Sequence, residues 1–333
     1  MSEFLKRKNI EISLQRYGID ALGAMAQGLF ASLIVGLILK VLGEKLGVAL
    51  LVEFGKTAMS MMGPAIGVAV AYGLKAPLLV FLPSTITGLA GAQLGGPAGA
   101  FAAAVIGAEF GKMVSKETKL DIIVTPAVTI AAGILTAQLV GPGIAAFMKG
   151  LGQVIMRATE LHPIPMGILV SVMMGMILTL PISSAALAIM LQLGGLAAGA
   201  ATVGCSTQMI GFAVASFREN GVGGLLSQGL GTSMLQIPNI VKNPFIWVPP
   251  TLASAILGPI ATTIIPMKNV PEGAGMGTSG LVGQFGTIQA MGMGAIPAIF
   301  LLHFILPAVL TLLISEAMRR LGYIKPGDMK IDV

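Results

Sequence analysis

Long apolar stretches with few charged residues dominate this 333-residue chain and limit what it can fold into. Several of them exceed the roughly 20 residues that a membrane-spanning helix requires. Charged residues make up 10% of the chain, whereas soluble domains carry about 25% and need them to cover a surface in water. The sequence therefore predicts an all-α, polytopic membrane protein with about eight to ten membrane elements. The apolar segments lie at about 20–42, 47–73, 76–92, 95–111, 121–148, 163–182, 183–217, 244–266 and 294–317.

Basic residues gather in three places between the apolar segments. Loops rich in lysine and arginine stay in the cytoplasm, so we expect both termini there and an even number of crossings of the membrane. This topology explains the net charge of +6 more simply than nucleic-acid binding, because no basic face interleaved with aromatic residues occurs. The basic residues are Lys6, Lys8, Arg7 and Arg16, then Lys112, Lys116 and Lys119, then Arg319, Arg320, Lys325 and Lys330.

The chain divides into four predicted parts. Residues 1–19 mix apolar and basic side chains, which favours an amphipathic helix that lies on an anionic lipid surface; a frayed tail is the alternative. A boundary between two halves, 20–148 and 149–318, is predicted at the charged loop 149–162. Residues 319–333 form a predicted cytoplasmic tail.

Two stretches, near 222–241 and 275–292, are too rich in Gly, Pro, Gln, Ser and Thr to form helices that face lipid. Irregular backbone at membrane depth is tolerated only where protein buries it or where it lines a cavity. We therefore predict two re-entrant hairpins here. Two broken segments in the same half also suggest that both surround one site.

Polar side chains in these stretches are the candidate solute-binding residues, because uncharged amides and hydroxyls can coordinate the hydroxyl groups of a sugar. Hydrogen bonding between helices is the alternative role. Glu272 belongs to a glycine-rich turn and could accept bonds from a polyol, although a solvated loop charge is the alternative. The predicted solute-binding set is Gln228, Thr232, Ser233, Gln236, Asn239, Asn243, Glu272, Ser279 and Gln284.

Glu160 and His162 form an ionisable pair at the entrance to the span that begins at Pro163. A histidine that titrates near neutral pH could gate the path. An interfacial anchor is the alternative.

Motifs of catalysis are not found in the sequence. It has no Walker loop, no nucleotide-binding glycine fingerprint after a strand and no His-Glu-x-x-His. The single cysteine, Cys205, can form neither a disulfide nor a cysteine metal site within one chain. We therefore expect no enzyme, no catalytic residue, no cofactor and no metal site.

Three segments resemble the IIC-type permeases of the bacterial phosphotransferase system, and more narrowly the branch that contains the perfringolysin regulator-like membrane proteins. They are His162 to Gly167, Leu180 to Ser184 and Asn269 to Gly277. The resemblance implies a homodimer with an N-terminal scaffold and dimerisation half. It also implies a transport half with two hairpins around a sugar. Phosphorylation of the sugar would need separate IIB and IIA proteins, because their phosphorylated Cys or His has no counterpart here.

Three functions are open at this point. The first is a permease subunit that translocates a small polar solute, in particular a carbohydrate. The second is a membrane sensor that binds a solute without net transport and reports it to a regulatory protein. The third is an ion-coupled secondary carrier, against which the scarcity of acidic residues in the spans argues.

Overall fold

The computed structural model describes residues 3–331, apart from the side chains of Lys45, Ala186 and Met190. Residues 1, 2, 332 and 333, the outer ends of the predicted interfacial helix and tail, lie outside the described residues. The described chain is 83% helical and contains no strand. Six of its helical stretches are long and apolar enough to cross a membrane. These findings confirm the predicted all-α, polytopic fold.

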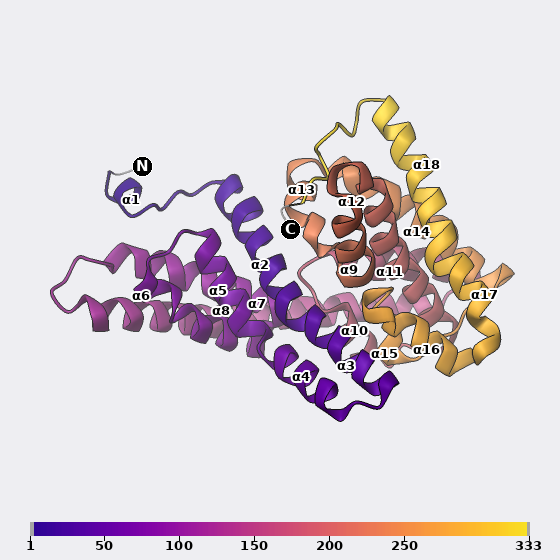
Figure 1. The fold of residues 1–333 in the computed structure, drawn as a ribbon, viewed down its shortest axis with the longest axis horizontal. Coiled ribbons are helices and arrows are strands. Elements are labelled where there is room, and N and C mark those ends of the chain that lie inside the picture. Colours follow the sequence, from indigo (N-terminus) through magenta and orange to yellow (C-terminus); the bar gives the residue numbers. More distant parts are fainter. Residues whose placement is uncertain (1–2, 332–333) are drawn as a thin grey trace. The chain divides into compact units, whose positions relative to one another are not determined.

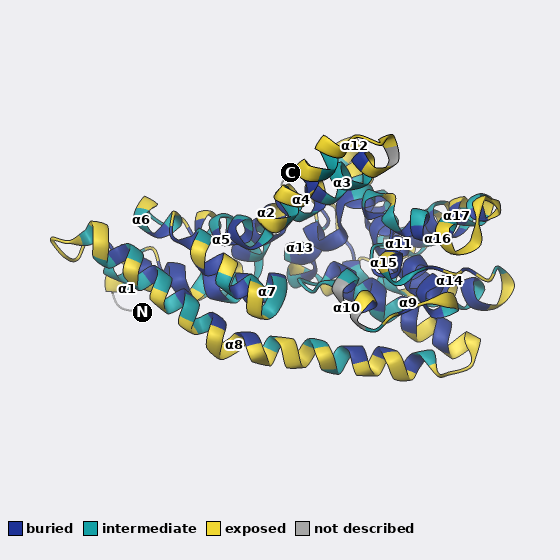
Figure 2. Cartoon of the chain, turned by 90° about the horizontal axis from the view of Figure 1, so that it is seen from below, coloured by how far each residue is buried: buried dark blue, intermediate teal, exposed yellow. Residues whose placement is uncertain are grey.

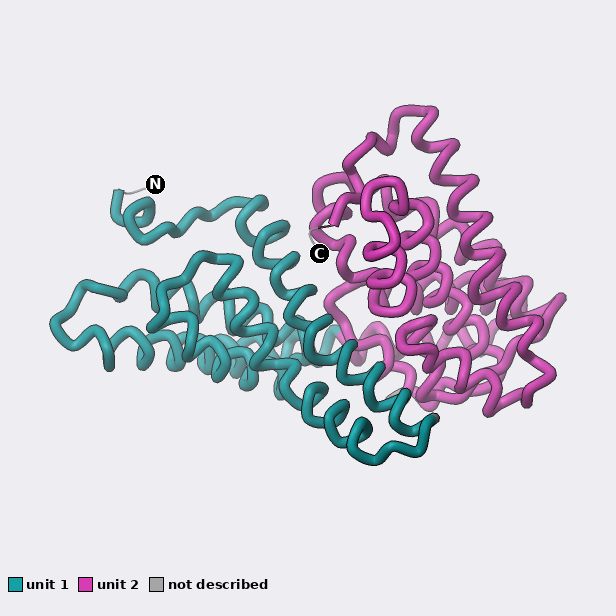
Figure 3. Tube along the Cα trace, viewed as in Figure 1, with its two compact units in different colours: residues 1–147 teal, residues 148–333 magenta. Residues whose placement is uncertain are grey.

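The chain forms two compact units, residues 1–147 and residues 148–333 (Figure 3). The division falls in a long helix, α8 (Asp121–Thr159), which belongs to both units. The roles predicted for the two halves, a scaffold and a transport half, remain predictions.

Unit 1 is built from long helices (Figure 1). One long helical stretch begins with η1 and runs without a break through α3. Glycines let the neighbouring helices approach closely, since a Cβ at Gly36 of α3 would lie 2.8 Å from the carbonyl oxygen of Gly55 in α4. The elements are α1 (Glu3–Arg7), η1 (Gln15–Ala21), α2 (Leu22–Leu29), η2 (Phe30–Ile34), α3 (Val35–Leu46), α4 (Ala49–Ser60), α5 (Met62–Gly73), α6 (Leu78–Phe81) and α7 (Ser84–Val114).

Helix α7 reverses direction in its middle. Gly95 and Gly96 have non-helical backbone angles, and Gly96 has a φ of 60°. A Cβ at Gly91 would meet the backbone of Gly99, although residues eight apart in a straight helix are about 12 Å apart. The two arms of α7 therefore pack side by side, and they correspond to the separate apolar segments expected at 76–92 and 95–111.

The N-terminal segment differs from the single helix expected for residues 1–19. Helix α1 ends at Arg7, and the chain turns at Asn9, where φ is 54°. The next helical residues begin beyond Ser13. The buried Arg16 donates a hydrogen bond to the carbonyl oxygen of Leu74 at 2.8 Å, so the segment is anchored to unit 1. Its position on a lipid surface remains a prediction.

Unit 2 contains shorter and more broken elements. They are α9 (Pro163–Thr179), α10 (Ser184–Met190), α11 (Gly195–Ala215), α12 (Phe217–Leu226), η3 (Ser227–Gly231), η4 (Ser233–Gln236), α13 (Ile237–Lys242), η5 (Pro244–Trp247), α14 (Val248–Pro259), η6 (Ile260–Ile264), α15 (Pro271–Ala274), η7 (Ser279–Leu281), α16 (Val282–Met291), η8 (Met293–Ala295), α17 (Ile296–Ile299), η9 (Phe300–Ile305) and α18 (Leu306–Arg320).

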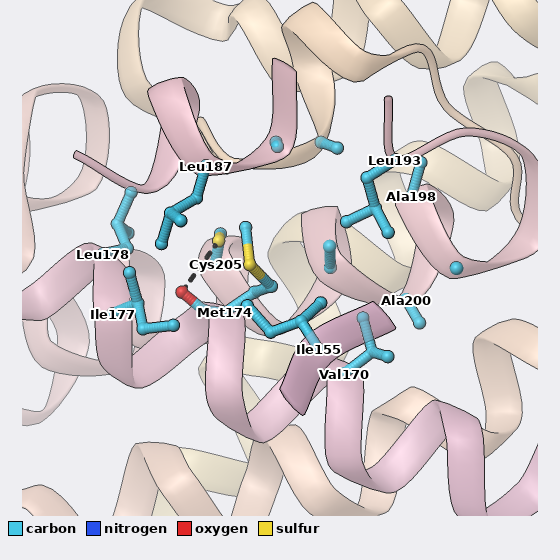
Figure 4. Packing of buried hydrophobic residues seen from close by; sticks show 14 of the residues in the cluster. Ile155, Val170, Met174, Ile177, Leu178, Leu187, Leu193, Ala198, Ala200 and Cys205 are labelled. Carbon is cyan, nitrogen blue, oxygen red and sulfur yellow. Dashed lines mark hydrogen bonds between the residues drawn. The ribbon is translucent and has the colours of Figure 1, made fainter. Parts of the chain in front are cut away.

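Helix α11 is the central helix of unit 2. In its most apolar window 89% of the residues are buried, and it packs against α9, α14 and α18. Small residues make this possible, because a Cβ at Gly204 would clash with the backbone of Ser171 in α9. Figure 4 shows the apolar core on one side of α11, where the thiol of Cys205 donates to the carbonyl oxygen of Met174 at 3.3 Å.

Apolar side chains also cover much of the surface. Along α8, Ile122, Leu135, Leu139 and Phe147 are all more than half exposed, and Figure 2 shows exposed residues along much of this helix. In water such a helix would invite aggregation. In a bilayer these side chains face hydrocarbon, which agrees with the predicted membrane location.

Candidate functional site

The two polar, broken segments of unit 2 touch each other. The hydroxyl of Thr278, in the second segment, donates a hydrogen bond of 2.5 Å to the carbonyl oxygen of Gly229, in the first. Breaks in the helices produce this arrangement: Gly221 has a φ of 58°, and Gly277 and Gly280 each have a φ of 52°, a region that glycine adopts without strain. Whether these segments are re-entrant hairpins remains a prediction.

Four amides of the predicted set, Gln228, Gln236, Asn239 and Asn243, form what we name the amide ladder. Gln236 Nε2 donates to Gln228 Oε1, and Asn239 Nδ2 donates to Gln236 Oε1, both at 2.8 Å. Gln228 Nε2 donates in turn to Ser216 Oγ at 2.9 Å. Gln228 and Gln236 are fully buried.

The chain's own C-terminal segment, residues 322–331, is hydrogen-bonded to the amide ladder. Gln236 Nε2 donates to the carbonyl oxygen of Met329 at 2.9 Å, and Asn239 Nδ2 to that of Lys330 at 2.8 Å. Asn243 Nδ2 binds the carboxylate of Asp328 at 2.7 Å. The amides therefore bind peptide groups of the tail in this structure.

Thr232 and Ser233 have separate partners. Thr232 Oγ1 accepts a bond from the backbone N–H of Met234 at 3.1 Å and caps η4. Ser233 Oγ lies 2.8 Å from Thr179 Oγ1 in α9. Gln208 of α11 then accepts bonds from Thr179 Oγ1 and from Trp247 Nε1, at 3.4 and 3.1 Å. Gln208 was not selected from the sequence, although it is the only amide in a long run of small and apolar residues.

The second broken segment surrounds Asn269, which was also not selected from the sequence. Asn269 Nδ2 lies 2.6 Å from Thr202 Oγ1, 2.9 Å from the carbonyl oxygen of Gly283 and 3.2 Å from Thr287 Oγ1, and its two hydrogens are shared among these three acceptors. Its backbone pairs with that of Gly195. Asn269 therefore joins α11 to α16.

Buried residues on α11, η7, α16 and η9 carry polar atoms that no group of the described chain satisfies. Gln284 Nε2 and His303 Nδ1 are 3.0 Å apart, but Gln284 Oε1 and His303 Nε2 have no partner. Ser279 Oγ and Ser206 Oγ are likewise buried without a partner. A Cβ at Gly277 would lie 2.8 Å from the backbone nitrogen of Ser206, so the second segment rests directly on α11. We name Ser206, Ser279, Gln284 and His303 the unpaired cluster.

The ionisable residues predicted for solute binding, Glu272, and for gating, Glu160 and His162, lie at the surface. Glu272 is exposed at the start of α15. Glu160 and His162 are exposed at the connection between α8 and α9, and His162 is the residue that precedes the first turn of α9. Residues 3–331 contain no group of three or more His, Cys, Asp or Glu side chains that could hold a metal ion.

Two open hollows in unit 2 are lined by apolar side chains. One of about 500 Å³ is lined by residues such as Phe245, Leu313 and Leu321, and one of about 420 Å³ by residues such as Ile210, Leu226 and Ile305. Neither includes a residue of the unpaired cluster. Such apolar hollows suit lipid chains more than a polar solute.

Comparison with known proteins gave one match. The family model described as Phosphotransferase system, EIIC matches residues 19–331, which is almost the whole chain. No curated protein and no solved structure matches.

Proposed function

The chain belongs to the EIIC family of the phosphotransferase system, and from that premise we propose that it carries a carbohydrate through unit 2. Membership makes it a membrane permease subunit of that system, integral to the bacterial cytoplasmic membrane. Such a subunit is the non-catalytic, channel component of the transporter. The solute and its binding residues are the proposed part.

The observation that carries the proposal is the unpaired cluster. A buried polar atom without a partner costs about 1–3 kcal/mol, and the cluster contains four such atoms, Ser206 Oγ, Ser279 Oγ, Gln284 Oε1 and His303 Nε2. The hydroxyl groups of a sugar both donate and accept hydrogen bonds, so they suit unpaired atoms of this kind. Ser279 and Gln284 belong to the predicted solute-binding set.

The chemistry of the buried groups favours a neutral solute. In unit 2 the described buried polar residues are hydroxyls, amides and one histidine, and none carries a fixed charge. A buried cation or anion requires an opposite charge, whereas the hydroxyl groups of a sugar require only hydrogen-bond partners. We therefore assign the amide ladder to the tail, and the unpaired cluster to the solute.

We further propose that unit 2 moves the solute while unit 1 serves as scaffold and dimer contact, with both termini in the cytoplasm. Phosphoryl transfer would be performed by separate IIB and IIA proteins. Cys205, the single cysteine, is buried with its thiol bonded to Met174, so it is not placed to accept a phosphoryl group. Gating by Glu160 and His162 is compatible with their exposed position at the start of α9.

Uptake assays test this function. The protein is reconstituted in liposomes with IIB and IIA proteins and phosphoenolpyruvate, and a panel of labelled carbohydrates is offered. We expect uptake of one class of sugar, and a loss of about 10- to 100-fold in the Gln284→Ala variant, because a ligand left without a buried partner binds about 1–3 kcal/mol more weakly. Gln153→Ala is the matched control, since Gln153 is exposed on α8.

Two results would overturn the proposal. Unchanged uptake in Gln284→Ala would show that the unpaired cluster does not bind the solute. Saturable carbohydrate binding without any uptake would show that the protein is a sensor that binds the carbohydrate and does not transport it.

A further inference from the structure

Unit 1 contains a basic cavity that the carbohydrate pathway does not use. Its volume is about 470 Å³, and it is lined by residues of three separate segments: 7–9, 75–77 and 112–117. Five cationic side chains and one carboxylate face it: Arg7, Lys8, Lys75, Lys112, Lys116 and Glu117. We propose that this cavity binds a phosphate group, namely the headgroup of an anionic glycerophospholipid.

The positive charge of the cavity is only partly neutralised by the protein. Glu117 pairs with Arg7 at 2.7 Å and with Lys8 at 2.5 Å. Lys75 and Lys116 form no ion pair within residues 3–331, and both are exposed. Asp121 also lies close, since it accepts a hydrogen bond from the backbone N–H of Lys116 at 2.7 Å. Five cations against Glu117 and Asp121 leave an excess of positive charge, which attracts an anion.

Lys112 of the cavity lining has a second buried cation, Arg16, beside it, because the two share their backbone partners. Arg16 and Lys112 are buried, and both donate to the carbonyl oxygens of Asn9 and Leu74. Glu109 pairs with Lys112 at 2.9 Å, but Arg16 forms no ion pair within the described chain. Burial weakens screening by solvent, so Arg16 raises the positive potential of the cavity.

The backbone around the cavity is held in an unusual conformation. Asn9, Lys75 and Lys116 have φ values of 54°, 55° and 61°, and they are three of the five described non-glycine residues with positive φ. Strained residues of this kind collect at binding sites, where the surrounding structure holds them in place. Here the bonds from Arg16 and Lys112 to Asn9 and Leu74 hold segment 7–9 next to segment 75–77. Lys8 joins segment 7–9 to segment 112–117 through the carbonyl oxygen of Ser115. The cavity is thus formed before any ligand enters.

The rim of the cavity favours a lipid over a free phosphate ion. Leu78 is 66% exposed next to Pro77, which lines the cavity, and Leu120 is 63% exposed after the loop that carries Glu117. A basic recess bordered by exposed apolar residues fits a charged headgroup together with its acyl chains. Two of its three segments, 7–9 and 112–117, belong to the basic regions expected to face the cytoplasm.

Thermal unfolding of the full-length, detergent-purified protein tests the proposal. Phosphatidylglycerol, phosphatidylcholine with the same acyl chains, and inorganic phosphate are titrated separately. We expect a saturable rise in Tm with phosphatidylglycerol alone, since a ligand that binds the folded state stabilises it. In Lys75→Gln/Lys116→Gln the concentration that gives half of this rise should increase at least about tenfold.

The control variant is Lys119→Gln/Lys149→Gln, which removes the same charge at exposed lysines that do not line the cavity. It should respond as the unmodified protein does. An equal rise with phosphatidylcholine, or an unchanged titration in Lys75→Gln/Lys116→Gln, would overturn the site. A rise with inorganic phosphate that this double variant loses would support the phosphate site and assign it to a soluble phosphate instead of a lipid.

Discussion

The two units bury polar groups of different kinds. In unit 1 the buried set includes three charged residues, Arg16, Glu109 and Lys112, and no amide. In unit 2 it includes six amides and no residue with a fixed charge. The amides are Gln208, Gln228, Gln236, Asn239, Asn269 and Gln284.

This difference indicates what each unit can bind. Buried charges are held by opposite charges and by carbonyl groups. In unit 1 they contribute to the basic cavity that suits the headgroup of an anionic lipid. Buried amides offer donors and acceptors without a fixed charge, so the interior of unit 2 can exchange protein partners for a neutral, hydroxylated solute. The predictions below test the difference, from the largest effect to the smallest.

Replacing Lys112 should disturb unit 1 most. Lys112→Met leaves the buried Glu109 without its ion-pair partner, so that within the described residues only the hydroxyl of Tyr17 still donates to it. Loss of one member of a buried pair costs about 3–5 kcal/mol. We expect a decrease of this size in the free energy of unfolding, measured by denaturant unfolding in detergent. The double variant Glu109→Gln/Lys112→Met should recover part of it, while the exposed Lys119→Met should change little. No decrease in Lys112→Met would contradict the role given to this pair.

Replacing Gly277 should disturb the contact between the second broken segment and α11. Gly277 has a φ of 52°, and a Cβ there would lie 2.7 Å from the backbone of Cys205. Strain and overlap together should cost about 3 kcal/mol in Gly277→Ala. Gly223→Ala is the control, because a Cβ at Gly223 meets nothing within 4 Å. Equal Tm values for the two variants would show that the segment does not rest on α11.

Replacing Gln236 should loosen the tail. Gln236→Ala removes the donor to Gln228 Oε1 and to the carbonyl oxygen of Met329, and such losses cost about 1–3 kcal/mol. We expect a lower Tm and faster proteolysis within residues 322–331, with carbohydrate uptake retained. The exposed Gln153→Ala should stay within about 0.5 kcal/mol. Loss of uptake at an unchanged Tm would show that the amide ladder takes part in solute transport and does not only hold the tail.

The smallest effect concerns pH and Glu117. A hydrogen bond from Lys8, assisted by the charge of Arg7, lowers the pKa of Glu117. The folded state therefore holds this proton less tightly than the unfolded state, so the pair stabilises the fold above the ordinary glutamate pKa of about 4.3. That stabilisation disappears as the pH falls through the lowered value. Glu117→Gln should flatten the acid side of the Tm profile, whereas Glu11→Gln, at an exposed position, should not.

Lipid as solvent makes the fold of this chain easy to predict. Backbone groups at membrane depth must be satisfied within the chain, so long apolar stretches become helices. The gap between the expected segments 76–92 and 95–111 directly precedes the reversal at Gly95 and Gly96. The stretch 183–217 was expected as one apolar segment, but α10 ends at Met190 and α11 begins at Gly195. Positive φ at Gln192 and Gly195 separates the two helices.

The partners of polar side chains could not be predicted in the same way. The amides of Gln236 and Asn239 were recognised as unusual, but their partners are carbonyl oxygens 93 and 91 residues away. Every residue carries a carbonyl group, so the sequence contains no signal for this choice. His303 is conspicuous as a polar residue in an apolar span, yet its contact with Gln284 depends on how the chain returns after α16. The lining of the solute site by the predicted residues remains a prediction.

One measurement tests the difference between the units most directly: the Tm shift given by a transported carbohydrate and by phosphatidylglycerol, in the unmodified protein, in Gln284→Ala and in Lys75→Gln/Lys116→Gln. The account predicts that Gln284→Ala loses only the carbohydrate shift and that the double variant loses only the lipid shift. A carbohydrate shift that survives in Gln284→Ala, or that disappears with the two lysines, would contradict it.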